Sequence, residues 1–316
     1  MKLAFGRLVR SGTMSLGFVV IAGFSVGLTH VAAMPAAHAG GNNDVLRFFP
    51  ADTTAAGVIN IAQGKKNPLF VKAAEQMRKF AGSSGDPIAK LGVDIAKDIS
   101  LISCGAAAKK NDVQPFICVL DGNFANAAGL RPAAGSAGTT SHQGITIITV
   151  DNKDFALVGK QLLVTNNGEM VTTINRGAGK APSALASKKA AWLKSALATA
   201  RSSRHIWAAL VPDAEQSAQV REKTGAIASW LTVSLTFGDP IAVELRAKTK
   251  SSAEADIMVA ALTTLAAEQQ KTLTTMGLTG LAASLVIDRK DSLVRFNAAA
   301  PTKEIETIVN LAKMLR

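Results

Sequence analysis

The chain has no tyrosine, and aromatic residues make up only 5% of it. Tyrosine is enriched where a recognition surface needs an apolar ring with a polar tip, so its absence argues against an aromatic binding surface. All three tryptophans, Trp192, Trp207 and Trp230, lie in the C-terminal half. Their apolar neighbours favour packing in a core, and the lining of a ligand groove is the alternative.

Histidine is also scarce, since beyond the first 39 residues the chain has only His142 and His205. Two histidines and two cysteines that lie dozens of residues apart do not match the spacing of zinc ligands. His142 follows Ser141, but neighbours in sequence are no evidence for a triad, which is assembled in space. His205 begins a predicted strand and remains a candidate site residue, although a histidine at the edge of a core is the simpler interpretation. The sequence therefore predicts no metal and no cofactor.

Familiar catalytic and phosphate-binding motifs are missing as well. The segment Arg176–Lys180 (RGAGK) partly resembles a phosphate loop, but Ile174 replaces the first glycine and Ala181 replaces the final Ser or Thr. Nucleophile-elbow, zinc-protease and calcium-loop patterns do not occur. The segment is better interpreted as part of a flexible linker.

One pair of carboxylates is a candidate for acid–base chemistry or metal binding. Asp94 and Asp98 would share one face if residues 93–98 formed a helical turn. The simpler account is that Asp94 caps this turn, because Asp is a favoured N-cap residue. Nothing near the pair in sequence completes a catalytic site.

The chain has only two cysteines, Cys104 and Cys118, and each lies in a strand-like run. If those two strands form a hairpin closed around Asn111, the cysteines lie opposite each other. A disulfide would then form in an oxidising compartment, and the alternative is two buried, reduced thiols.

The N-terminus, in contrast, carries a strong signal. Lys2, Arg7 and Arg10 precede an apolar run over residues 14–31, and Ala37-His38-Ala39 follows. This layout is typical of a secretory signal peptide over residues 1–39. An uncleaved membrane anchor over residues 14–34 is the alternative, because 21 residues are long enough to span a bilayer. We therefore expect an exported protein, either periplasmic or secreted.

The net charge is +12, with 35 Lys and Arg against 23 Asp and Glu. Without the three basic residues of the leader it is +9, and this excess is spread along the whole chain. A diffuse positive charge predicts weak attraction to anionic lipids or polymers. It does not predict specific nucleic-acid binding, which needs clustered basic residues with aromatic stacking partners.

The pattern of apolar residues predicts an α+β fold, with two related units of antiparallel sheet whose helices pack on one face. The units cover residues 40–176 and 188–316, joined by a linker over 177–187. Both show the same order of elements, which suggests an internal duplication. Predicted strands cover residues 55–62, 99–106, 115–121, 145–150, 155–158, 161–165, 205–211, 228–237, 241–248, 281–287 and 293–298. Predicted helices cover residues 67–80, 124–130, 169–176, 188–201 and 252–275, with a last helix from Pro301, and a surface loop covers 131–144.

Three segments together resemble a loose group of exported, largely uncharacterised proteins of myxobacteria, planctomycetes and relatives. They are Leu46–Thr53, with Pro50 and Asp52; Gly92–Ile99, with Asp94 and Asp98; and Phe116–Phe124. The resemblance implies an envelope or secreted protein with repeated α+β units, and it assigns no catalytic residue. Cys118 and the lack of a lipoprotein cysteine depart from the pattern of the group.

These observations predict an exported, non-enzymatic binding or structural protein of the periplasm or cell envelope, with an unknown ligand or envelope partner. One alternative is an exported hydrolase whose site is not visible in the sequence, with Asp94, Asp98 and His205 as its candidates. The other alternative is a binder of anionic envelope polymer or lipid, which the positive charge would support.

Overall fold

The computed structural model describes residues 42–71, 87–108, 114–132, 136–188, 190–199, 205–305 and 307. The predicted signal peptide lies outside this part of the chain. So do most of the predicted helix over 67–80, the link over 109–112 and most of the final helix.

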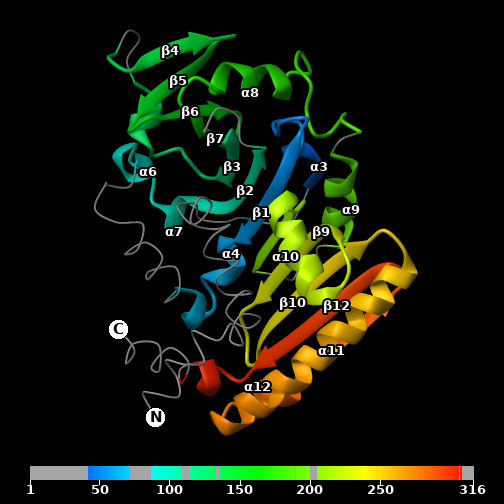
Figure 1. Ribbon diagram of the computed structural model, residues 1–316. Helices are drawn as coiled ribbons and strands as arrows, with labels where there is room; N and C mark the ends of the chain where they lie inside the picture. The colour runs from blue at the N-terminus through cyan, green and yellow to red at the C-terminus, as the bar shows by residue number, and fades with distance from the viewer. Residues whose placement is uncertain are drawn as a thin grey trace.

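Twelve strands form one antiparallel sheet in the order β11-β12-β10-β9-β8-β1-β2-β3-β7-β6-β5-β4 (Figure 1). In the first half they are β1 (Thr53–Asn60), β2 (Ile99–Ala107), β3 (Phe116–Gly122), β4 (Thr139–His142), β5 (Ile145–Val150), β6 (Lys153–Val158) and β7 (Gln161–Asn166). In the second half they are β8 (Ile206–Leu210), β9 (Ala228–Thr236), β10 (Ile241–Thr249), β11 (Val286–Lys290) and β12 (Leu293–Ala300).

The longer described helices are α8 (Met170–Gly177), α9 (Ala191–Thr199), α10 (Ala214–Thr224) and α11 (Ser252–Thr275). Short helices are α3 (Asn42–Val45), α4 (Ile61–Gly64), α6 (Pro87–Lys90), α7 (Ile95–Asp98), η1 (Ala128–Leu130) and α12 (Thr279–Ala283). The α+β class is therefore confirmed.

The strand order repeats in the two halves. The run β1-β2-β3-β7-β6 of the first half corresponds to β8-β9-β10-β12-β11 of the second. The halves meet where β1 pairs antiparallel with β8, and Gly57 lies opposite Ala208 in the middle of that ladder. A local two-fold relation through this pair therefore matches β1, β2, β3, β7 and β6 with the five strands of the second half, whereas β5 and β4 extend the sheet beyond the matched strands.

Helices cover both faces of the sheet, whereas the sequence predicts helices on one face only. Ile117 and Val119 of β3 pack in one core with Met170 of α8 and Leu193 of α9. Cys118 and Leu120, which point the other way, pack in a second core with Ile88 of α6. Because both faces of β3 are apolar, each face needs its own cover.

We name the two faces by these residues. The first face carries Val119, Trp207 and Trp230, and α8 and α9 lie over it. The second face carries Cys104, Cys118 and Leu120, with α6 and η1 over the first half. A third core lies on the second face of the second half, where Ala255 and Met258 of α11 pack on the sheet with other residues. That core also contains Ala226, Ala228, Ala247 and Val294.

The segment 177–187 connects the two halves, but it is anchored rather than flexible. Ala184 is fully buried, and its backbone N–H donates to the carbonyl of Phe49 at 3.0 Å. The N–H of Leu185 donates to the carbonyl of Leu46 at 3.2 Å. The small side chains that suggest a loose linker instead allow close backbone approach to the segment before β1.

Three further elements differ from the sequence-based expectation. The predicted loop over 131–144 contains β4, which turns into β5 through Gln143 and Gly144, both with positive φ. The predicted strand over 281–287 begins instead as α12. The backbone N–H groups of Gly280 and Leu281, in the first turn of α12, donate to the carboxylate of Glu304. This cap comes from a residue distant in sequence, so a local pattern does not reveal it. Helix α10 lies where no element is predicted, and it begins with a capping box formed by Asp213 and Gln216.

Candidate functional site

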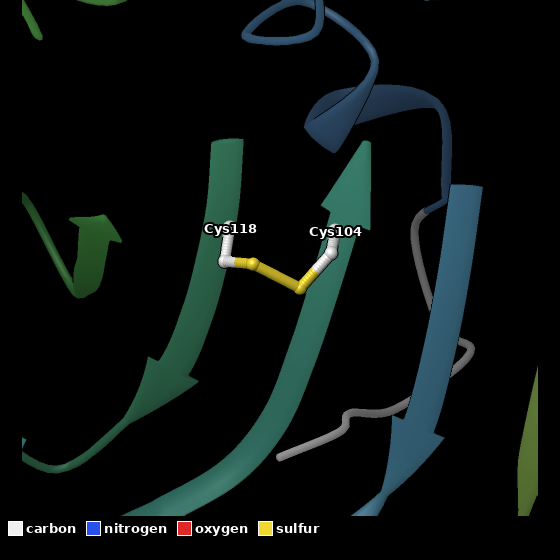
Figure 2. The surroundings of a disulfide bond; sticks show 2 residues. All are labelled: Cys104 and Cys118. Atoms are coloured by element: carbon white, nitrogen blue, oxygen red, sulfur yellow. A yellow bond between two sulfur atoms is a disulfide. The ribbon is translucent and has the colours of Figure 1, made fainter. Parts of the chain in front are cut away.

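The predicted hairpin of β2 and β3 is confirmed, and its two cysteines form a disulfide. Cys104 and Cys118 lie directly opposite each other, with their Cα atoms 4.1 Å apart (Figure 2). Both side chains are buried in the second-face core of the first half. A formed disulfide is consistent with an oxidising, non-cytoplasmic compartment.

The two candidate carboxylates act as helix caps. Asp94 is the N-cap of α7, and its Oδ1 accepts hydrogen bonds from the N–H groups of Ala96 and Lys97 at 2.9 and 3.2 Å. Asp98 Oδ2 accepts a hydrogen bond from the N–H of Asp94 at 2.7 Å. The two residues do share one short helix, but each binds backbone donors of that helix, as the capping interpretation predicts.

His205 is a buried residue at the edge of the core. Its Nδ1 accepts a hydrogen bond from the backbone N–H of Phe237 at 3.0 Å. The rings of Phe237 and Phe70 lie 5.8 and 6.2 Å from the imidazole, centroid to centroid. Burial lowers the pKa of His205, because desolvation disfavours the charged imidazolium.

This lowered pKa gives a testable pH dependence of stability. Below about pH 6.5 the unfolded chain takes up a proton at this position before the folded chain does, so the free energy of unfolding falls. Above that pH the contribution is fully present. We expect urea unfolding of the wild type to move to lower midpoints between pH 7.5 and pH 5.5. The variant His205→Gln should show a smaller shift, and His142→Gln is the matched control. An unchanged shift in His205→Gln would contradict the assignment.

The candidates do not assemble into one site. Within the described residues, no hydrogen bond or ion pair joins His205 to Asp94 or Asp98. His142 lies elsewhere, where its Nε2 is 3.0 Å from Oδ1 of Asn175. In the same part of the chain, no group of three or more His, Cys, Asp or Glu side chains is arranged to hold a metal ion. Trp207 and Trp230 are buried in the first-face core, and Trp192 packs against it.

A different feature stands out in the second half, where the usual arrangement of polar and apolar positions is reversed. On the first face of β9 and β10, the buried side chains include Thr232, Ser234, Glu244 and Arg246. On the second face of the same strands, five apolar side chains are only half-buried, whereas Ile241 and Ala247 on that face are buried. The five are Leu231, Val233, Leu235, Val243 and Leu245. Normally the apolar positions of a strand are the buried ones.

Because of the two-fold relation, the burial of matching residues in the two halves can be compared row by row. One row of directly paired residues crosses the second face of the whole sheet. In the first half it runs through Ile148, Phe155, Val164, Cys118 and Cys104, which are buried, to Gly57, which is half-buried. From Ala208 in the second half it continues through Val233, Leu245, Phe296 and Ile287, and all five are half-buried. Along this row the face is therefore closed from β5 to β2 and open from β1 to β11.

The next row towards the β9–β10 turn is half-buried too, and consists of Ile206, Leu235, Val243 and Ala298. The row on the opposite side is largely closed, because Ala247 and Val294 are buried beneath the first turns of α11. We call the half-buried residues of the two rows on β8, β9, β10 and β12 the open apolar face. They are Ile206, Ala208, Val233, Leu235, Val243, Leu245, Phe296 and Ala298.

Helix α11 borders this face and leaves part of its own apolar stripe half-buried. Ala255 and Met258 are buried on the sheet, but Leu262 and Leu265, on the same side of the helix, are half-buried. The helix has 24 residues and is about 36 Å long, longer than the strands it follows. Figure 1 shows it running alongside β12. A straight helix over a twisted sheet covers only part of the sheet closely.

The open apolar face has no charged side chain of its own. Arg289 points to the same face from the edge strand β11, where its Nε and Nη2 donate to the carboxylate of Asp256 at 2.5 and 2.9 Å. The surface therefore offers apolar contact but no nucleophile, acid, base or metal ligand.

The sequence shows the alternating pattern of the strands that form this face, but it does not show that their apolar side stays half-buried. In β10 (IAVELRAKT) the positions alternate between apolar and charged side chains, which is typical of a strand with its apolar side buried. The half-buried state of that side depends on which helix lies above it. The only sequence signal is α11, whose apolar stripe continues beyond the residues that the sheet buries.

No protein-family model matches the chain, and no curated protein sequence matches it. Solved structures of TP0453 share the fold. Crystal form III has a TM-score of 0.50 and 10% sequence identity, and the match covers 84% of this chain and 96% of that one. Crystal form I has a TM-score of 0.49 at the same identity. The resemblance to exported envelope proteins is not addressed by these comparisons and stays a prediction. No helix within the described ranges is long and apolar enough to cross a membrane.

Proposed function

We propose that the protein is an exported, non-enzymatic binding protein that holds an apolar ligand on the open apolar face of its second half. The observation that carries the proposal is a difference in burial between matching residues of one row. Val164 and Cys118 are buried, whereas their counterparts Phe296 and Leu245 are half-buried. Half-buried apolar side chains gain free energy when a ligand removes the rest of their surface from water.

Export is the second part of the proposal. The leader over residues 1–39 has the layout of a signal peptide, and the disulfide fits an oxidising compartment. The periplasm and the cell envelope are the proposed locations. An envelope partner or an anionic lipid would then be encountered in the same compartment as the ligand.

The test is a titration of the exported protein with N-phenyl-1-naphthylamine, a neutral fluorophore whose emission increases in apolar surroundings. We expect saturable binding that depends little on salt, because the site has no charge to be screened. A steep loss of binding with salt would indicate instead that the diffuse positive charge carries the interaction.

A matched pair of variants locates the site. Leu245→Asn places an amide in the middle of the open apolar face and should weaken binding of the fluorophore about tenfold, since a lost apolar contact of this size is worth about 1.5 kcal/mol. Val286→Asn makes a similar change on the other face, at an exposed position of β11, and should leave binding unchanged. Equal affinity of both variants would contradict the proposal.

A further inference from the structure

We infer that the C-terminal segment 306–316 of this chain lies across the open apolar face as an amphipathic helix and competes with the ligand for that face. This inference rests on the proposed function and adds its regulation. Four observations support it.

The first observation is the place where the segment begins. Strand β12 ends at Ala300, which pairs with Ile241 beside the β9–β10 turn. A helix begins at Thr302, whose backbone N–H donates to Oδ1 of Asp239 in that turn at 3.0 Å. The carboxylate of Glu304 accepts two backbone N–H groups of α12 at 2.7 and 2.8 Å. The start of the helix is therefore fixed at the edge of the open apolar face, between the turn and α12.

The second observation is the orientation of this helix, which the structure describes at residues 302–305 and 307. Lys303 and Thr307 are exposed, whereas Glu304 and Ile305 are half-buried. Positions three and four residues apart share one side of a helix, so the sequence predicts that the inward side continues from Ile305 as an apolar stripe. The stripe consists of Ile308, Val309, Ala312 and Leu315.

The third observation is that the two half-buried rows lie between two closed ones. On one side, Ala247 and Val294 are buried beneath the first turns of α11. On the other side, Ile241 and Ala300 are buried next to the start of the C-terminal helix. A helix that continues from Ile305 across the strands would cover the strip that remains.

The fourth observation is that the segment has the length that the face requires. The middle row from Ala208 to Phe296 crosses four neighbouring strands, a span of about 14 Å at 4.8 Å per strand. As a helix with a rise of about 1.5 Å per residue, residues 306–316 extend about 16 Å. The segment is also tethered beside the face, so its effective concentration there is on the order of millimolar, which favours it over a segment of another protein.

The first experiment measures docking of the segment without any ligand. Trypsin cleaves after Lys313, and a docked helix resists cleavage because it has to open first. Ile308→Asn places an amide on the inward side and should speed the release of residues 314–316 about tenfold, the factor expected from one lost apolar contact. Thr307→Asn, on the exposed side, is the control and should be cleaved at the wild-type rate. Equal rates in Ile308→Asn and the wild type would overturn the inference.

A second pair of variants connects the segment to the open apolar face. Leu245→Asn lies on that face, far from Lys313 in sequence, and should also speed the cleavage after Lys313. Val286→Asn, on the other face, should not. Cleavage that is unchanged in Leu245→Asn would show that the segment docks elsewhere, which would overturn the inference.

The second experiment measures the competition with the ligand. A chain that ends at Ile305 should bind N-phenyl-1-naphthylamine about tenfold more tightly than the full chain, since a docked segment lowers the apparent affinity by the fraction of open molecules. A synthetic peptide of residues 301–316 should displace the fluorophore from the shortened chain. Equal affinity of the two chains would overturn the inference while the proposed function stands. If the fluorophore binds neither chain but the cleavage results hold, the proposed function fails while the docking of the segment stands.

Discussion

Replacing Phe155 with alanine is expected to lower the free energy of unfolding by about 3–5 kcal/mol, whereas Phe296→Ala should lower it by only about 1 kcal/mol. The two phenylalanines belong to one row on one face of the sheet, in opposite halves. Phe155 is fully buried in the core that α6 covers, so its loss leaves a cavity. Phe296 is half-buried, so water already reaches part of its ring.

The measurement is chemical denaturation of both variants followed by circular dichroism at a common pH. The ratio of the two losses matters more than either value, because the substitution is the same and both strands are paired on both sides. Equal losses would show that the row is closed in both halves, and the open apolar face would then not exist in solution.

The largest effect after Phe155→Ala is expected from removing the disulfide. The double variant Cys104→Ala/Cys118→Ala should lose about 3 kcal/mol of stability, because the bridge closes a loop with a sequence separation of 14 residues. Without the bridge, the unfolded chain regains the conformational entropy of that loop. The strands β2 and β3 that it joins lie in the closed half, so binding to the open apolar face should be retained.

Reduction supplies the control. Dithiothreitol should destabilise the wild type by a similar amount and should not affect the double variant. Thiol titration of the unfolded, unreduced wild type should find no free thiol. Identical unfolding midpoints with and without reductant would contradict a stabilising role of the bridge.

Much of the fold follows from local sequence. The hairpin of β5 and β6 is marked by alternating residues around Asp151 and Asn152, both with positive φ, and the structure confirms it. Helix α11 begins after Ser251, whose side chain accepts a hydrogen bond from the N–H of Glu254, and its predicted bounds are confirmed. The cysteine pairing follows in the same way, because the hairpin brings the two residues together.

The roles of the candidate site residues, in contrast, do not follow from local sequence. Asp94, Asp98 and His205 are residues of chemically suitable types, yet each is used locally, for capping or for core packing. No local pattern could identify the open apolar face, because its members come from four strands and look like ordinary buried positions. The anchored segment around Ala184 and the cap that Glu304 gives to α12 likewise depend on distant partners.

The sequence by itself determined the α+β class, most strand positions and the placement of the two cysteines opposite each other, because these depend on periodicity, turn residues and neighbours in one hairpin. Only the tertiary structure decided that both halves share one sheet, that helices lie on both of its faces and that one half remains open. The physical reason is that burial is a property of the layer above a strand. Apolar side chains on the second face are buried beneath α6 in the first half and partly half-buried beside α11 in the second.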